Sequence, residues 1–198
     1  MTPFQYIAVK TTFQSPLGLM TLAANDKGLV GIWFDGQKHQ PDLAAWATVN
    51  NHPVLDQAKA ALQAYFSGQS KDWKLAIDET IGTDFQRQVW SQLRKIPTGK
   101  TVSYADIAHA IGRPKAVRAV GAAVGRNPLS IVTPCHRVIG SNGALTGYAG
   151  GIERKIALLK LESALWTPLS LDQLLGSLNL FYSPPSGGPL FYLCALEP

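Results

Sequence analysis

The sequence predicts an α/β protein of the α+β type, with a small N-terminal domain of sheet and helix followed by a mainly helical domain that contains a helix-turn-helix. Three observations predict it. Apolar and polar residues alternate around turn signals in the first third of the chain, one long amphipathic segment follows, and apolar residues recur at helical spacing from residue 84 onward. We expect domains over 1–80 and 81–165, followed by an atypical, loosely structured tail over 166–198.

The first domain is predicted to begin with a β-hairpin. The runs GLMTLAA (18–24) and LVGIWF (29–34) flank the turn signal NDKG. Segment 53–68 then places its apolar residues near one helical face, with Pro53 in the first turn and Gly68 at the C-terminal end. These residues are predicted to pack the core and to carry no chemistry.

Two capping boxes predict helix starts in the second domain. Thr83 with Gln86 precedes the pattern DFQRQVWSQLRKI, and Ser103 with Asp106 precedes YADIAHAI. The segment KTVSY between the two helices is short and β-prone.

A third helix completes a helix-turn-helix. Gly112 ends YADIAHAI, and Pro114 suits the first turn of KAVRAVGAAVG. Most helix pairs at this spacing are ordinary core, but Ala and Gly leave this second helix almost bare, and Arg118 projects from it. The basic residues around it favour docking onto phosphates: Arg113, Lys115, Arg118 and Arg126. Residues 84–160 hold 12 Lys or Arg against 3 Asp or Glu, which fits a polyanionic partner.

The last predicted elements flank the sequence IVTPCHRVIG. LSIVT (129–133) is predicted to be a buried strand, and a glycine-rich loop follows over 139–151. The segment IERKIALLKLESAL is predicted to be a helix whose inward-facing apolar residues are Ile152, Ile156 and Leu159.

Composition bears on the location of the protein. The 198 residues are 46% hydrophobic and 16% charged, which is typical of a soluble globular protein. The first residues show no signal-peptide pattern, so we expect a cytoplasmic protein. The almost uncharged tail contains SPPSGGP, whose Pro and Gly residues argue against a membrane helix, so we expect no membrane association.

Cys135 has three candidate roles: structural thiol, metal ligand or nucleophile. By residue type alone, a buried cysteine is most often a small hydrophobe. The other cysteine is Cys194, and the four histidines form no closely spaced pair, so we expect no metal site. His136 and Arg137 are candidates to stabilise a thiolate. Because neighbouring residues of an extended chain point apart, a Cys–His contact requires a turn, which Pro134 favours, or a bridging water.

Several segments together resemble the O6-alkylguanine-DNA alkyltransferase family, the methylated-DNA–protein-cysteine methyltransferases, which move an alkyl group from a damaged base onto their own cysteine. They are PCHRVIG, SYADIA, GRPKAVRAVGAAVGRNP, GYAGG and KIALLKLE, with SPLGLMTLA, GLVGIWF and GTDFQRQVW in the more variable N-terminal half. PCHRV is specific by itself, and the ordered set is hard to obtain by chance.

The resemblance implies catalytic roles for five residues. Cys135 would accept the alkyl group, His136 would take the thiol proton through a water, and Glu162 would orient and charge-balance that histidine. Tyr104 would aid rotation of the nucleotide and donate a hydrogen bond to guanine N3. Asn127 would be a hinge between the recognition helix and the segment that carries the cysteine.

The resemblance also implies how DNA would be bound. Arg118 would enter the duplex and fill the space of the extruded nucleotide, and the helix that carries it would lie in the minor groove. Other DNA-binding positions on or beside this helix are Ala119, Gly121 and Arg126. The base pocket would be lined by Tyr148, Val138, Ala149 and Gly150. Some family members carry a hydroxyl residue where this chain has Ala149.

The implied partner is double-stranded DNA containing alkylated bases. The implied reaction is a direct, irreversible, single-turnover transfer from guanine O6 and thymine O4. We expect no cofactor, no obligatory protein partner and a monomer. The tail matches nothing in the family.

Three alternatives belong to other functional classes. The first is a non-catalytic binder of alkylated DNA, against which Cys135 argues, because such relatives carry another residue at the acceptor position. The second is a helix-turn-helix transcription factor, which would prefer one DNA sequence over a lesion. The third is a cysteine hydrolase, which would turn over a small ester.

Overall fold

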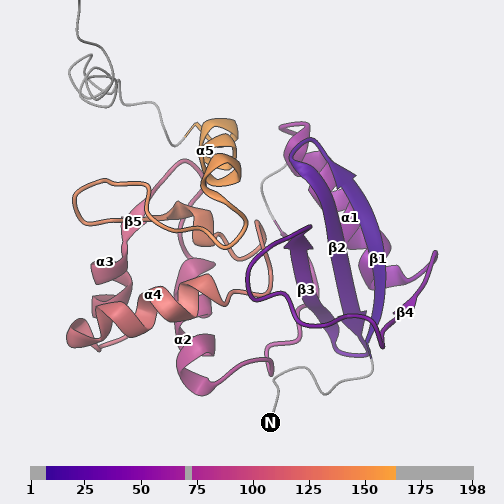
Figure 1. The fold of residues 1–198 in the computed structure, drawn as a ribbon, viewed down its shortest axis with the longest axis horizontal. Helices are drawn as coiled ribbons and strands as arrows, with labels where there is room; N and C mark the ends of the chain where they lie inside the picture. Colours follow the sequence, from indigo (N-terminus) through magenta and orange to yellow (C-terminus); the bar gives the residue numbers. More distant parts are fainter. Residues whose placement is uncertain (1–7, 70–72, 164–198) are drawn as a thin grey trace, which may run out of the picture. The chain divides into compact units, whose positions relative to one another are not determined.

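The computed structural model describes residues 8–69 and 73–163 (Figure 1). The predicted tail over 166–198 lies outside the described residues, and so does Cys194. Within the described part of the chain, no helix has both the length and the apolar character needed to cross a membrane.

The N-terminal sheet has the strand order β3-β2-β1-β4. Its strands are β1 (Val9–Ser15), β2 (Gly18–Asn25), β3 (Gly28–Phe34) and β4 (Ala47–Thr48). β2 pairs antiparallel with both β1 and β3, and β4 pairs parallel with β1. The predicted hairpin is therefore confirmed.

The turn of this hairpin depends on two of its residues. The side-chain Oδ1 of Asn25 accepts hydrogen bonds from the backbone N–H groups of Lys27 and Gly28, at 2.9 and 3.1 Å. Gly28 has a φ of +144°, and a Cβ there would lie 2.7 Å from the Ala76 carbonyl. Only glycine fits both the conformation and the close approach.

Helix α1 (Pro53–Phe66) lies along one face of this sheet (Figure 1) and is the helix predicted over 53–68. Pro53 stands at its first position, and Gly68 follows its end with a φ of +73°. The helix buries Leu55, Ala58, Leu62 and Tyr65 against side chains of β2 and β3.

The second half of the described chain is mainly helical. Its elements are α2 (Asp84–Leu93), β5 (Val102–Ser103), α3 (Tyr104–Ala110), α4 (Val117–Gly125), β6 (Val138–Ile139) and α5 (Ile152–Leu161). Both predicted capping boxes are present, Thr83 with Gln86 and Ser103 with Asp106. The helix predicted after Pro114 begins with a short 3-10 turn (Pro114–Ala116) before α4.

The predicted strand over 129–133 is wrong. These residues are buried, but they turn back on themselves: the Thr133 N–H donates to the Leu129 carbonyl at 2.9 Å, and Ile131 has a φ of 73°. Only Leu129 forms a β-bridge, with Ile32 of β3. A short apolar run indicates burial, and burial does not by itself decide between a strand and a buried turn.

The predicted inward face of α5 is also partly wrong. Ile152 is 40% exposed, whereas Leu159 is buried as expected, and Lys155 takes an inward position beside Leu158. Lys155 can occupy this position because two backbone carbonyls accept hydrogen bonds from its ammonium group. The buried stripe is therefore rotated from the one that hydrophobicity alone predicts.

Two hydrophobic clusters fill the described chain. One joins α2, α3 and α4 to side chains of β2 and β3, and the other joins α1 and α5 to further side chains of the same strands. Tyr148, from the loop before α5, packs against both clusters. The predicted domain boundary near residue 80 stays a prediction.

Candidate active site

Cys135 opens a single 3-10 turn, Cys135–Arg137, directly after Pro134. The turn expected at this proline is present. It sends consecutive side chains to different partners, so that Cys135 lies against Asn127 while His136 and Arg137 both reach Glu162. The Cys135 side chain is buried, with only 6% of the residue exposed.

Asn127 is in direct contact with the thiol. Its Nδ2 lies 3.0 Å from Cys135 Sγ and also donates to the Thr133 carbonyl at 2.8 Å, while its Oδ1 accepts from the Leu129 N–H at 3.0 Å. Since Asn127 follows the end of α4, these bonds tie the thiol to that helix. The residue expected to be a hinge is thus also a hydrogen-bond donor to sulfur.

The thiol is protonated at neutral pH. Burial raises the pKa of Cys135 to about 11, although the Asn127 hydrogen bond and the nearby Lys155 charge both act to lower it. Because the nucleophile is the thiolate, a base must remove this proton before Cys135 can react.

His136 has the properties of that base. It is completely buried, and its Nε2 lies 3.0 Å from Glu162 Oε1. With Glu162 ionised, Nε2 carries the proton and Nδ1 is left with a free lone pair. Nδ1 has no hydrogen-bond partner among the described residues. Burial lowers the pKa of His136 even though Glu162 raises it, so the ring is neutral at neutral pH.

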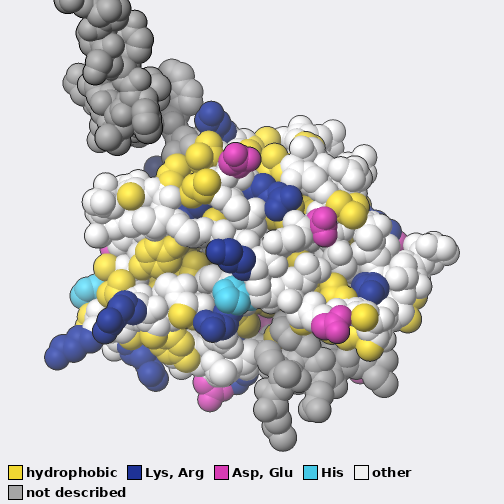
Figure 2. Space-filling view, in the orientation of Figure 1, with side chains coloured by type: hydrophobic (Ala, Val, Ile, Leu, Met, Phe, Trp, Pro, Cys, Tyr) yellow, Lys and Arg dark blue, Asp and Glu magenta, His cyan; other side chains and the backbone are white. Residues whose placement is uncertain are grey.

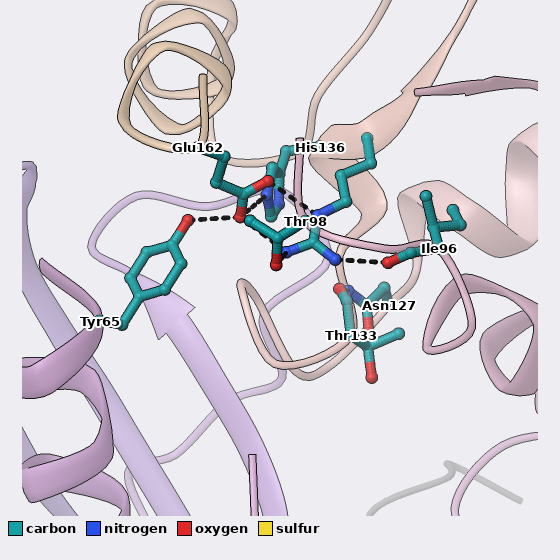
Figure 3. A network of polar contacts seen from close by, with 8 residues as sticks. Tyr65, Ile96, Thr98, Asn127, Thr133, His136 and Glu162 are labelled. Carbon is teal, nitrogen blue, oxygen red and sulfur yellow. Dashed lines mark hydrogen bonds and ion pairs between the residues drawn. The ribbon is translucent and has the colours of Figure 1, made fainter. Parts of the chain in front are cut away.

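Glu162 is the centre of a buried network (Figure 3). Its Oε1 accepts hydrogen bonds from the hydroxyl of Tyr65 at 2.7 Å, from His136 and from Nη2 of Arg137 at 2.8 Å; its Oε2 accepts from Nε of Arg137 at 2.8 Å. Burial would raise the pKa of Glu162, but the hydrogen bonds and charges of His136 and Arg137 outweigh it and lower the pKa to about 2. The carboxylate is therefore ionised throughout the physiological range.

Arg137 was a candidate to stabilise the thiolate, and the structure places it on Glu162 instead. The guanidinium binds both oxygens of the carboxylate and also donates to the Ile96 carbonyl and to Thr98 Oγ1. A buried arginine needs an anionic partner. The sequence therefore indicates that Arg137, if buried, has an acidic partner. It does not indicate which carboxylate that partner is.

Tyr65 was read only as core, yet its hydroxyl completes the Glu162 network from α1 (Figure 3). Burial, followed by the nearby Glu162 charge, raises the pKa of Tyr65, so the phenol is a donor at any ordinary pH. The signal in the sequence was a tyrosine on an otherwise apolar helix face, because a buried hydroxyl must find a partner.

We expect Tyr65→Phe to lower the free energy of unfolding by about 1–3 kcal/mol, because Glu162 then loses one donor while the aromatic packing is kept. Urea unfolding at pH 7 measures this loss. Ser67→Ala is the matched control, since it removes an exposed hydroxyl bonded to the Ala64 carbonyl in the same stretch of chain. Equal losses of unfolding free energy in the two variants would show that the hydrogen bond from Tyr65 to Glu162 does not stabilise the fold.

Lys155 is a second residue near the thiol whose role could not be predicted from the sequence pattern. Its Nζ is buried and donates to the Val138 carbonyl at 2.6 Å and the Thr146 carbonyl at 2.9 Å. Burial lowers its pKa to about 8, and the proximity of Cys135 acts in the opposite direction. An ammonium held by neutral carbonyls beside a thiol stabilises a thiolate when one forms.

The residues predicted to contact the base surround the same turn. Val138 is buried in β6, which pairs parallel with β5, and Tyr104 begins α3 directly after β5. Burial raises the pKa of Tyr104, and a hydrogen bond with Thr146 lowers it. Tyr148 is packed, and burial raises the pKa of its hydroxyl well above the usual value.

The other two predicted pocket residues follow Tyr148. Ala149 is half-buried and its carbonyl accepts from the Lys38 N–H at 3.0 Å; Gly150 is buried. Ala149 and Gly150 therefore lie beside Tyr148 in the loop before α5, and their role in the base pocket stays a prediction.

The other residues predicted to contact DNA lie on α4 or at its end. Arg118 and Ala119 are exposed on α4, Gly121 is half-buried beneath the ring of Tyr104, and Arg126 is exposed at the end of the helix. In Figure 2, Lys and Arg side chains gather around α4, and few acidic side chains lie among them. Two contacts lead from α4 toward the thiol. Gly121 lies against the ring of Tyr104, and Asn127, just after the helix, donates to Cys135 Sγ.

Comparisons with known proteins agree across both halves of the chain. Residues 8–78 match the ribonuclease-like domain, and residues 84–164 the DNA binding domain, of 6-O-methylguanine DNA methyltransferase. A methylated-DNA–protein-cysteine methyltransferase of Methanosarcina barkeri is 50% identical over 152 residues, which cover 75% of this chain and 93% of that protein. One from Mycolicibacterium paratuberculosis is 46% identical over 151 residues, covering 76% and 90%.

A solved structure shows the same agreement. The crystal structure of Mycobacterium tuberculosis OGT in complex with DNA is 42% identical, covers 83% of this chain and 98% of its own, and has a TM-score of 0.72.

Proposed function

The chain belongs to the 6-O-methylguanine DNA methyltransferase family, and we propose that it repairs DNA by moving the alkyl group of an O6-alkylguanine onto Cys135. The observation that carries the proposal is the arrangement at the CHR turn. A buried thiol with a raised pKa is followed by a neutral histidine whose Nδ1 is free and whose Nε2 is held by an ionised carboxylate.

The proposed reaction begins with a proton transfer. His136 Nδ1 takes the thiol proton of Cys135 through a water, and Glu162 stabilises the imidazolium that forms. Lys155 and the amide of Asn127 stabilise the thiolate.

The thiolate then attacks the alkyl carbon. A sulfur–carbon bond forms as the carbon–O6 bond breaks, and the electron pair of the broken bond goes to guanine, which takes up a proton. Tyr104 donates a hydrogen bond to N3 of the departing base. The thioether product is stable and does not release the alkyl group, so each protein molecule acts once.

Binding of the lesion requires nucleotide flipping, because O6 lies inside the base stack. The proposal places α4 in the minor groove, with Ala119 and Gly121 permitting close approach and Arg126 contacting phosphate. Arg118 then occupies the space left by the flipped nucleotide. The base enters a pocket walled by Val138 and Tyr148–Gly150.

We also propose that O4-alkylthymine is a second substrate. We propose further that the protein acts in the cytoplasm as a monomer, without a cofactor or an obligatory partner. A non-catalytic role in binding alkylated DNA would leave the thiol of Cys135 and the free Nδ1 of His136 without a chemical role.

We expect Arg118→Ala to slow transfer from an alkylated duplex by about ten- to a hundredfold, because a few kcal/mol of flipping cost is no longer offset. Transfer from a free O6-alkylguanine base should change by less than about threefold, since that substrate needs no flipping. Single-turnover rates on the two substrates measure the difference.

Arg126→Ala is the matched control on the same helix. Losing a phosphate contact should weaken duplex binding in a salt-dependent manner and leave the maximal transfer rate unchanged. If Arg118→Ala behaved in the same way, its role would be phosphate binding and not insertion into the duplex.

A further inference from the structure

Arg154 joins three segments that are far apart in the sequence. It lies in the first turn of α5, and its Nε donates to the Leu17 carbonyl at 3.0 Å, in the turn between β1 and β2. Its Nη1 donates to the Asp35 carbonyl at 3.3 Å, just after β3, and to the Gly150 carbonyl at 3.0 Å. All three acceptors are backbone carbonyls, which suits a residue that fixes the course of the chain.

The same guanidinium lies over an aromatic ring, 4.8 Å from the ring centroid of the fully buried Phe34. A Cβ at Gly150 would come within 3.2 Å of the Phe34 ring and 2.8 Å of the Tyr148 ring. Gly150 therefore lies close against the rings of both Phe34 and Tyr148, and the guanidinium lies over the same Phe34 ring.

The carbonyls of Tyr148–Gly151 show why a side chain is needed here. The outer two accept hydrogen bonds from within the turn and helix, Tyr148 from the Gly151 N–H and Gly151 from the Lys155 N–H. The inner two are held by other parts of the chain. Ala149 accepts from the backbone of Lys38, and Gly150 accepts from Arg154.

We propose that Arg154 is a positioning residue that holds the wall of the base pocket, Tyr148–Gly150, in the position required for transfer. This inference rests on the proposed function of the pocket. Without the guanidinium, the Gly150 carbonyl loses its donor, and the Phe34 ring against which Gly150 packs loses its cation. A displacement of about 1 Å at a reacting centre can cost as much as about a hundredfold in rate.

The test compares two Arg-to-Met variants. Arg154→Met keeps an unbranched apolar stem beside Phe34 and removes every donor. Arg94→Met is the control, because it makes the same substitution and loses the same charge at an ion pair with Glu79 (2.7 Å) in which Glu79 is mostly exposed. Single-turnover rates are measured on an O6-methylguanine duplex and on free O6-benzylguanine, per mole of protein able to accept an alkyl group.

We expect Arg154→Met to be about tenfold or more slower than Arg94→Met on both substrates, with equal affinity for undamaged duplex. Arg154→Lys, which keeps the charge and some donor capacity, should give an intermediate rate and serves if the Met variant does not fold. Equal rates per active protein would overturn the inference, and so would a loss confined to the duplex, which would indicate a DNA contact. If the wild-type protein transferred nothing, the proposed function itself would fail.

Discussion

Replacing Cys135 with alanine is expected to abolish alkyl transfer and to leave binding of alkylated duplex within about threefold of wild type. Transfer fails because no other described side chain combines a thiol with the His136–Glu162 pair. Binding persists because α4 and the pocket wall do not depend on sulfur. Label transferred from O6-methylguanine DNA to protein measures the first effect, and fluorescence anisotropy of a labelled duplex measures the second.

Cys194→Ala is the control for this prediction, because it removes the other cysteine of the chain. It should transfer at the wild-type rate. Normal transfer by Cys135→Ala, or loss of transfer in Cys194→Ala, would show that Cys135 is not the acceptor. Either result would remove the basis of the mechanism.

The second large effect is expected at Glu162. Glu162→Gln keeps the shape of the side chain but leaves the buried Arg137 guanidinium without a counter-charge and His136 without a carboxylate. Removing one partner of a buried ion pair typically costs about 3–5 kcal/mol of stability. Losing support for the base should slow transfer by about 10²- to 10⁴-fold. Urea unfolding and single-turnover kinetics give the two values.

The stability difference should depend on pH in a defined direction. The pKa of Glu162 is depressed from 4.5 to about 2, so its contribution is fully present above pH 4.5 and is lost as the pH falls toward 2. The gap between wild type and Glu162→Gln should therefore narrow over that window.

Glu79→Gln is the matched control for the Glu162 variant. It breaks the ion pair of the exposed Glu79 carboxylate with Arg94 and should cost no more than about 1 kcal/mol. Comparable losses in the two variants, or a gap that stayed constant down to pH 2, would contradict the electrostatic account of Glu162.

Local signals predicted the parts of the fold that depend on local interactions. The hairpin around Asn25 and Gly28 and the caps at Thr83 and Ser103 involve residues at most three apart, so the sequence displays both partners together. The turn at 129–133 was mistaken for a strand because its burial depends on packing against β3, which the apolar run does not specify.

The site required more than the sequence pattern. Cys135 and His136 are adjacent, but Glu162 lies 26 residues from His136 and Tyr65 lies 97 residues from Glu162. The role of Glu162 was predicted from the family resemblance. The part that Tyr65 plays in the network is visible only in the folded chain. Lys155 was hidden because a lysine on an amphipathic helix is normally assigned to solvent.

The central claim is that Cys135 itself takes the alkyl group, and mass spectrometry tests it most directly. The protein is incubated with a duplex carrying one O6-methylguanine, and the intact chain and its peptides are then weighed. The account predicts one added methyl group on the peptide containing Cys135, saturating at one per protein molecule. Binding of the lesion with no change in mass, or a methyl group on any other residue, would contradict it.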